Sequence, residues 1–174
     1  MKSRGRLIAG ASLVVASVIA VTGGISHAGQ RNQTVFKSNV LIGVSAPYTG
    51  TANPIRGIPG GGAPWVIGDA EARLRADGDV EVEVEGLVVD PAFPNPAVAG
   101  INPAPTWKIT VSCLSKDAAG AAVTTNVSSK PVNVGTDGNA EIESKVDLPS
   151  PCFAPIIFVA NGAGNGAWFA ASGA

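Results

Sequence analysis

Apolar and charged residues alternate along residues 65–89, on both sides of a short polar segment at 77–79. A repeat of two residues is typical of half-buried β-strands. The pattern therefore predicts an antiparallel hairpin, in which directly opposite residues share one face of the sheet. A three-residue loop over 77–79 keeps the apolar and charged faces apart, whereas a two-residue loop mixes them. In this register the apolar pairs are Ala76 with Val80, Leu74 with Val82, and Ala72 with Val84. The charged pairs on the other face are Arg75 with Glu81 and Arg73 with Glu83.

The alternation changes phase at Gly68 and Gly86, which the predicted register brings near each other. A glycine inside a strand pattern often marks a bulge or a bend. We therefore expect the hairpin to bend at this pair, as strands do at the corner of a sandwich. The residues that then change face are Trp65, Ile67, Leu87 and Val89.

Further short runs follow at the intervals typical of an all-β domain. They cover residues 106–113, 123–127, 140–146, 153–160 and 167–171. The nearly unbroken apolar run at 153–160 is typical of a central strand, and Pro131 indicates that the strand before it lies at a sheet edge. Seven or eight strands favour an antiparallel β-sandwich of the immunoglobulin-like or Greek-key type, with a closed β-barrel as the second choice.

We expect residues 64–174 to form a single β-sandwich domain. Residues 29–63 are rich in Gly, Pro, Thr, Asn and Ser, and only 39–44 has the character of a strand. This composition predicts a flexible N-terminal arm with one edge strand. The proline-rich residues 90–105 are too long for a tight turn and indicate a crossing between the two sheets.

The first residues predict a secretory signal peptide over residues 1–28. Basic residues come first, at Lys2, Arg4 and Arg6, and an uncharged run follows over residues 7–21. The small residues Ser26 and Ala28 then stand before the expected cleavage point. The apolar run is short for a membrane span. We therefore expect cleavage between Ala28 and Gly29, which would make the mature chain a secreted, extracellular protein.

The chain has two cysteines, Cys113 and Cys152. Exported proteins fold where disulfides form and persist, so we predict a bond between them. Cys113 shares the apolar face of its strand with Trp107, and Cys152 directly precedes an apolar strand. The bond would therefore tie two strands across or beside the core.

Removing residues 1–28 takes away three of the 12 basic residues, so nine oppose 13 acidic ones and the mature charge is −4. This balance predicts no nucleic-acid or membrane partner for the mature chain. The single histidine, His27, leaves with the signal peptide. Without imidazole, the mature chain cannot build a Ser-His-Asp or Cys-His centre, or a zinc site of His and Cys.

Two loop sequences formally match ligand sites. Residues 162–167 fit the Gly-x-Gly-x-x-Ala dinucleotide pattern, but they lack the following helix and acidic residue, so we expect a hairpin turn and no cofactor. Calcium is conceivable at Asp77-Gly78-Asp79 or at Asp137-Gly138-Asn139, since it prefers oxygen ligands. Both are also ordinary turn sequences, which we favour, and we predict no metal site.

Glu81, Glu83 and Glu85 alternate with valines and point together to one face of the predicted hairpin. Paired carboxylates can hydrolyse glycosides without histidine. A solvated strand face explains the same pattern, because nothing in the sequence puts an acid in a pocket that would raise its pKa.

The mature chain has nine aromatic residues, of which three are tryptophans. Trp65, Trp107 and Trp168 could line a sugar-binding face, but Trp107 falls on the expected core face, where packing is the better interpretation. Trp168 and Phe169 are adjacent, so their side chains point to opposite faces of a strand. Core packing or edge covering is the default for them. If one is exposed, it marks the best candidate for an aromatic contact with a partner.

Four short patterns resemble small exported β proteins predicted in Gram-positive soil bacteria. They are Gly-Leu-Val-Val at 86–89, Asn-Pro-x-Pro-x-Trp at 102–107, Val-Ser-Cys-Leu at 111–114 and Gly-x-Trp-Phe-Ala-Ala-Ser-Gly at 166–173. The resemblance covers residues 60–174. That group has no known activity, so the resemblance implies no functional residue.

Taken together, these features predict a secreted, non-catalytic β-sandwich with a binding or structural role at the cell exterior. A cell-surface polymer or a protein is the expected partner. Two alternatives remain: an extracellular hydrolase that uses carboxylates, and a carrier of a small apolar ligand inside a barrel.

Overall fold

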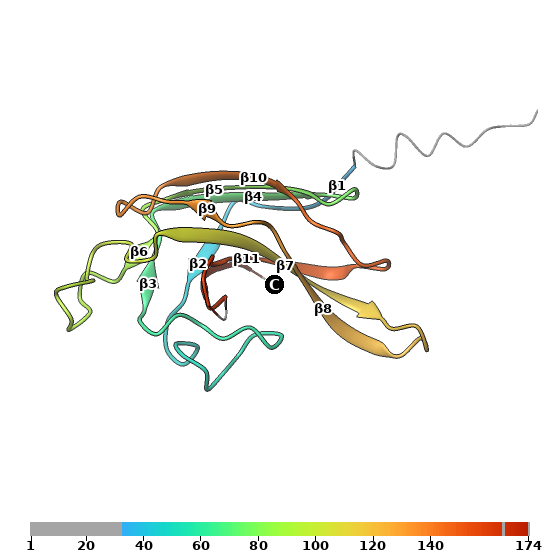
Figure 1. The fold of residues 1–174 in the computed structure, drawn as a ribbon, viewed down its shortest axis with the longest axis horizontal. Helices are drawn as coiled ribbons and strands as arrows, with labels where there is room; N and C mark the ends of the chain where they lie inside the picture. The colour runs from blue at the N-terminus through green and yellow to red at the C-terminus, as the bar shows by residue number, and fades with distance from the viewer. Residues whose placement is uncertain (1–32, 165, 174) are drawn as a thin grey trace, which may run out of the picture.

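The computed structural model describes residues 33–164 and 166–173, and in them the chain is all β. The strands are β1 (Thr34–Ser38), β2 (Leu41–Gly43), β3 (Trp65–Val66), β4 (Asp69–Arg75), β5 (Asp79–Glu85), β6 (Val88–Val89), β7 (Thr106–Lys116), β8 (Ala122–Ser128), β9 (Val132–Asn133), β10 (Ala140–Lys145), β11 (Phe153–Asn161) and β12 (Trp168–Ser172). They form a four-stranded sheet, a six-stranded sheet and a short two-stranded one, and the first two are stacked (Figure 1). None of these sheets closes into a barrel, so the prediction of an antiparallel sandwich is confirmed and the barrel is not.

The four-stranded sheet has the order β1-β4-β5-β10. Its central hairpin keeps the predicted faces but pairs two residues away from the predicted register, with Leu74 opposite Val80. The three-residue loop is therefore 76–78, not 77–79. The reason lies at Gly78, which has φ +92° and donates its N–H to the Arg75 carbonyl at 3.0 Å. A turn that ends in a left-handed glycine is a preferred three-residue hairpin loop.

The six-stranded sheet has the order β2-β12-β11-β7-β8, and β9 pairs with β7 beyond the end of β8. β11 is central and β8 lies at an edge, as the apolar run and Pro131 predicted. The crossing over 90–105 leads from β6 to β7 and so joins different sheets.

The predicted bend at Gly68 and Gly86 is confirmed. Gly86 has φ +65°, and Gly68 donates its N–H to the Glu85 carbonyl at 2.9 Å. Beyond them the hairpin continues as the β3–β6 pair, and the buried residues change parity, with Trp65, Leu87 and Val89 now inside.

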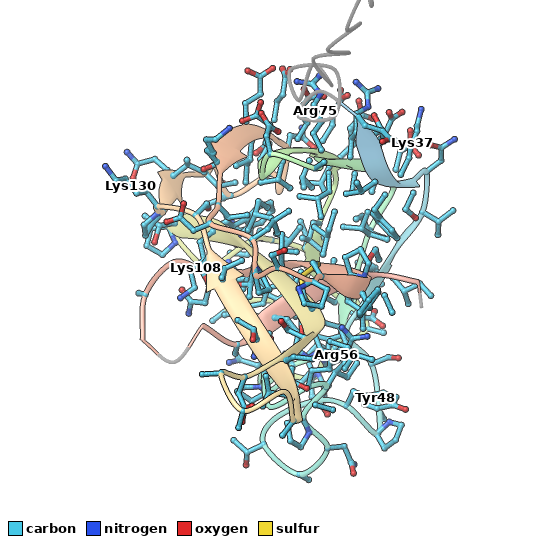
Figure 2. All side chains as sticks on the ribbon, turned by 90° about the vertical axis from the view of Figure 1, so that its right-hand side faces the viewer. Lys37, Tyr48, Arg56, Arg75, Lys108 and Lys130 are labelled. Atoms are coloured by element: carbon cyan, nitrogen blue, oxygen red, sulfur yellow. A yellow bond between two sulfur atoms is a disulfide. The ribbon has the colours of Figure 1, made fainter. Side chains whose placement is uncertain are left out.

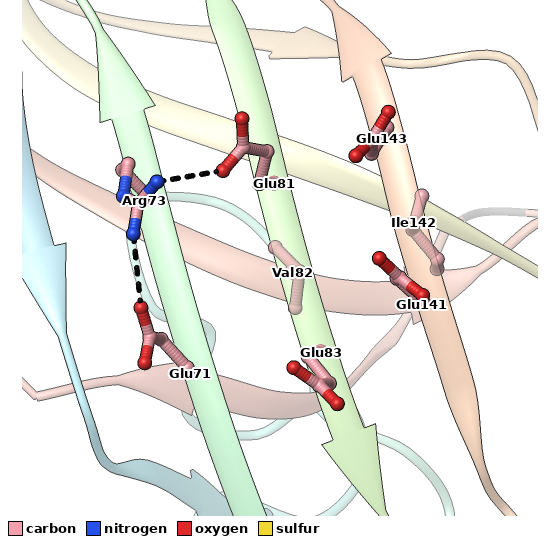
Figure 3. Close-up of a pocket in the computed structure, with 8 residues that line it drawn as sticks. All are labelled: Glu71, Arg73, Glu81, Val82, Glu83, Glu141, Ile142 and Glu143. Carbon is pink, nitrogen blue, oxygen red and sulfur yellow. Dashed lines mark hydrogen bonds and ion pairs between the residues drawn. The ribbon is translucent and has the colours of Figure 1, made fainter.

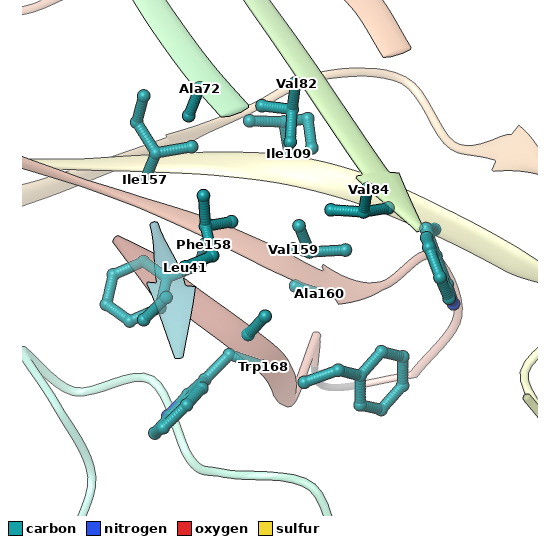
Figure 4. Close-up of a cluster of buried hydrophobic side chains, with 14 of the residues drawn as sticks. Leu41, Ala72, Val82, Val84, Ile109, Ile157, Phe158, Val159, Ala160 and Trp168 are labelled. Atoms are coloured by element: carbon teal, nitrogen blue, oxygen red, sulfur yellow. The ribbon is translucent and has the colours of Figure 1, made fainter. Parts of the chain in front are cut away.

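The core lies between the two large sheets. Figure 4 shows Ala72 and Val82 on the strands of one sheet and Ile157 on the facing side of the other. Fully buried residues from both sheets fill this layer: Ala72, Leu74, Val80, Val82, Val84 and Ile142 from the first, and Trp107, Ile109, Val111, Cys113, Ile157, Val159 and Ala170 from the second. The alternation seen in the sequence therefore marks the inner faces correctly.

The segment predicted as a flexible arm contributes more structure than its composition indicates. It holds two strands where the sequence predicts one: β1 pairs with β4, and β2 pairs with β12. Leu41, Val44 and Ile58 join the buried core. The predicted signal peptide and the Ala28–Gly29 cleavage site lie outside the described residues. The described part of the chain contains no helix with the length and apolarity that crossing a membrane requires.

Candidate functional site

A long loop, residues 45–61, covers the outer face of the six-stranded sheet, on the side away from the four-stranded sheet (Figure 1). Its two ends meet at β12, where Val44 donates to the Phe169 carbonyl and Gly61 to the Trp168 carbonyl, both at 2.8 Å. The ends also bond each other, since Gly60 donates to Gly50 and Gly50 to Gly61. The loop is thus a closed flap whose base is fixed to the sheet.

The tip of this flap is fixed as well. Ile55 and Ile58 exchange two backbone bonds around a tight turn, in which Arg56 and Gly57 have φ of 49° and 81°. The Arg56 guanidinium donates to the Ser112 carbonyl of β7 at 2.8 Å, and Asn126 of β8 donates to the Arg56 carbonyl at 3.0 Å. Figure 2 shows Tyr48 and Arg56 at the end of the molecule opposite Lys37 and Arg75. The flap therefore spans the sheet from β2 to β8.

Between the base of the flap and the strands β2, β12 and β11 lies a cavity of about 280 Å³, which we call the Trp168 cavity. Apolar groups form most of its wall. Its lining residues are Ile42, Gly43, Ser45, Tyr48, Ile55, Ile156, Trp168, Ala171, Ser172 and Gly173. Ile42 is 60% exposed and Tyr48 is 44% exposed, whereas Ile156 and Trp168 are buried. Two exposed apolar side chains therefore lie beside a buried apolar floor.

Trp168 is the unusual member of this lining. Its ring is 4% exposed and packs against Phe158, with the ring centroids 5.9 Å apart. Its Nε1 atom is buried and has no hydrogen-bond partner among the described residues. A buried tryptophan N–H usually finds an acceptor, and leaving a buried donor unpaired costs about 1–3 kcal/mol. Trp168 thus lines the cavity, and it also carries one unused donor that is itself buried.

Trp168 and Phe169 lie on opposite faces of β12, as their adjacency predicts. Trp168 packs against Phe158 on the outer side, while Phe169 stacks on Trp65 inside, at 4.0 Å between ring centroids. Figure 4 shows Trp168 on the side of β11 away from Ile157. Neither ring is exposed, with 4% and 5% of its surface accessible, so the exposed aromatic contact considered at these two residues is wrong. The sequence could not show that the flap would cover the outer face.

A second apolar groove, of about 440 Å³, lies under the proline-rich crossing. We call it the end groove. It is lined by Gly62, Ala63, Trp65, Val89, Phe93, Val98, Pro103, Ala104, Pro105, Asn161, Ala163 and Phe169. Asn102 holds the crossing in place, because its amide donates to the carbonyls of Ala104 and Gly135 and accepts from Trp107. The end groove has aromatic walls. The hydrogen bonds of the Asn102 amide are all made to other groups of the protein.

The carboxylates noted in the sequence lie on the outer face of the four-stranded sheet (Figure 3). Glu83 stands directly opposite Glu71 on one side and Glu141 on the other. Arg73 contacts Glu81 at 3.1 Å, not Glu83 as the predicted register implied. Arg75 does contact Glu81, at 2.8 Å, but diagonally across the pair.

Glu71 lies on this face, and its pKa is lower than that of a free glutamate. A hydrogen bond from the Lys37 ammonium, 3.0 Å away, lowers the pKa of Glu71 despite some opposing desolvation. A glycosidase general acid needs the opposite, a raised pKa that keeps the carboxyl protonated. This face therefore resembles a solvated charged surface more than a catalytic pair.

The two turns considered for calcium have other contacts. The carboxylates of Asp77 and Asp79 hold the Lys145 ammonium at 3.1 and 2.7 Å. Asp137 accepts bonds from the backbone and side chain of Asn139. The described residues contain no group of three or more acids, cysteines or histidines that could hold a metal ion. The Gly-rich segment at 162–167 connects β11 to β12, so a strand and not a helix follows it.

Cys113 and Cys152 form the predicted disulfide, with 4.9 Å between their Cα atoms. The bond joins β7 to the residue before β11, and these strands are neighbours in the six-stranded sheet. Neither cysteine is among the residues that line the two apolar cavities.

Sequence reasoning missed Ile42, Tyr48 and Ile55, which complete the Trp168 cavity. The available signal was a set of large apolar residues in a segment otherwise rich in Gly and Pro, which a purely flexible arm does not need. Comparison of the chain with protein-family models, curated proteins and solved structures finds no match.

Proposed function

We propose that this protein is a secreted, non-catalytic binding protein, and that the Trp168 cavity holds one apolar group that carries a hydrogen-bond acceptor. The predicted signal peptide and the disulfide support a role outside the cell. Binding pockets are mostly apolar with a few placed polar groups, and this cavity has that character.

The single observation that carries the proposal is the unpaired, buried Nε1 of Trp168, a residue that lines this apolar cavity. Because Nε1 is buried, the Trp168 ring must turn slightly for an acceptor oxygen in the cavity to reach it. Such a bond would recover part of the roughly 1–3 kcal/mol that the unpaired donor costs. The volume of about 280 Å³ suits a single ring or a branched side chain, not a long oligosaccharide. The bound group would thus be a terminal or side-chain moiety of a polymer or protein at the cell exterior.

Two small probes of the same shape test the acceptor. Acetophenone has a carbonyl oxygen, and ethylbenzene is its matched control without one. The assay is a titration of the mature chain, residues 29–174, followed by the indole N–H signals in a ¹H–¹⁵N spectrum. We expect acetophenone to shift the Trp168 signal, identified by its loss in Trp168→Phe, and to bind about 10-fold more tightly than ethylbenzene. In Trp168→Phe the preference between the two probes should disappear.

A pair of alanine variants shows which cavity is used. Ala171 lines the Trp168 cavity and Ala163 lines the end groove. We expect Ala171→Leu to abolish acetophenone binding and Ala163→Leu to leave it unchanged. The reverse result, or no acetophenone binding at millimolar concentration by a folded chain, would refute the proposal. Retention on isolated cell walls, compared between wild type and Ala171→Leu, then tests the cell-exterior partner.

A further inference from the structure

β8 forms one edge of the six-stranded sheet, and among the described strands it pairs with β7 alone. The β7–β8 hairpin projects from the body of the molecule on the right of Figure 1. In an antiparallel pair, every second residue exchanges backbone bonds with its partner, and the residues between point their N–H and C=O groups away. At the two ends of this pair, the Asp117 N–H donates to the Ala121 carbonyl and the Ser129 N–H donates to the Ile109 carbonyl. The odd-numbered residues of β8 are therefore the ones whose backbone groups bond β7.

The even-numbered residues of β8 therefore direct their backbone groups to the free edge: Ala122, Thr124, Asn126 and Ser128. Each offers one donor and one acceptor. The side-chain contacts of this strand do not block the edge, since Asn126 bonds the Arg56 carbonyl and Ser128 bonds Thr110, which both lie toward the sheet. A row of four backbone donors and four acceptors is thus open along the seven residues of β8.

Folded proteins usually protect such an edge with charged residues, proline, a bulge or a short strand. The other edges of the large sheets follow this rule: β1 carries Lys37, β10 carries Glu141, Glu143 and Lys145, and β2 has three residues. β8 has the sequence AVTTNVS, with no charge, proline or glycine. It is the one long edge of the described sheets without any of these protections.

We propose that β8 is a docking edge for a second copy of this chain, which adds its own β8 in antiparallel orientation about a two-fold axis at Thr125. This register sets Ala122 opposite Ser128 and Thr124 opposite Asn126, so all outward groups find partners. It places no like charges opposite each other, and it sets Thr125 opposite Thr125 of the second copy, a favourable cross-strand pair.

The charged residues at the two ends of β8 support a second copy of the chain as the partner. The Asp117 carboxylate is held in the turn before β8 by the N–H groups of Ala119 and Ala121, both at 2.9 Å. Lys130 follows β8. Antiparallel pairing about Thr125 sets Lys130 of one copy opposite Gly120 of the other, beside that carboxylate, and the two-fold axis repeats the pair. An isologous contact of this kind closes at two copies.

Sedimentation equilibrium of the mature chain, from about 10 μM to about 1 mM, tests this pairing, because one strand pair makes a small interface of modest affinity. Thr124→Pro removes an outward N–H that the monomer does not use, and Thr124→Ala is the matched control that keeps it. We expect a monomer–dimer equilibrium for wild type and Thr124→Ala, weakened at least about 10-fold in Thr124→Pro. A monomer throughout, assembly beyond two copies, or equal dimerisation of all three would overturn the proposal.

Amide exchange of the wild-type chain decides the question even if Thr124→Pro does not fold. The amides of Thr124 and Asn126 should exchange more slowly at 1 mM than at 10 μM, roughly in proportion to the dimer formed. The Thr125 amide, which already bonds β7, serves as the internal control and should not change. Equal exchange of Thr124 at both concentrations would contradict strand pairing.

Discussion

Reduction of the Cys113–Cys152 bond tests how strongly the sandwich depends on a covalent tie. The two cysteines are 39 residues apart in sequence. In the chain-entropy model, closing a loop of that length lowers the entropy of the unfolded chain by about 13 cal/mol/K, which is about 4 kcal/mol at 25 °C. Reduction removes no heavy atom, so the change carries no cavity cost. We therefore expect the free energy of unfolding to fall by about 4 kcal/mol.

The assay is equilibrium urea unfolding of residues 29–174 with and without a strong reductant. Cys113 is fully buried, so reduction is carried out in the unfolded state and followed by refolding in reductant. With a slope of about 2 kcal/mol per molar urea, typical for a chain of this size, the midpoint should fall by about 2 M. Thiol alkylation and mass measurement confirm the redox state of each sample.

Two results would refute this reasoning. An unchanged midpoint in a sample proven to be fully reduced would show that the loop-closure entropy does not control stability here. Alkylation of both thiols in the oxidised, unfolded protein would show that the bond does not form at all.

Two further predictions concern the hairpin loop. Gly78→Ala should destabilise the protein by at least about 3 kcal/mol in urea unfolding, because Gly78 has positive φ and an added Cβ would overlap the Val146 carbonyl oxygen. Gly120→Ala, also at positive φ but with open space around it, should cost only about 1–2 kcal/mol, and equal losses would contradict the overlap. The pKa of Asp77 is lowered first by the Asp79 N–H and also by Lys145, so its stabilising effect holds above its unfolded pKa and is lost as pH falls through the folded pKa. An NMR titration should find the Asp77 pKa higher in Lys145→Met but still below 3.8, and no change would exclude a role for the ammonium.

The proposed site was less predictable than the fold. Alternation placed Trp107 and Val82 in the core, and the adjacency of Trp168 and Phe169 placed them on opposite faces. The burial of Trp168 depends on the 45–61 flap, whose sequence lacks any regular period. Contacts such as Arg56 to the Ser112 carbonyl join residues 56 positions apart, and no local pattern specifies them.

The sequence by itself determined the sheet faces, the bend at Gly68 and Gly86, the edge position of β8 and the pairing of the two cysteines. These features follow from side-chain period, backbone freedom and the number of thiols, all of which are local or compositional. Only the tertiary structure decided the two-residue shift in the hairpin register, since both registers keep the same faces and Gly78 must also fit against Val146. It likewise decided that a glycine-rich segment covers the outer sheet and leaves an apolar cavity lined by Trp168 beneath it, because that arrangement depends on contacts between distant strands.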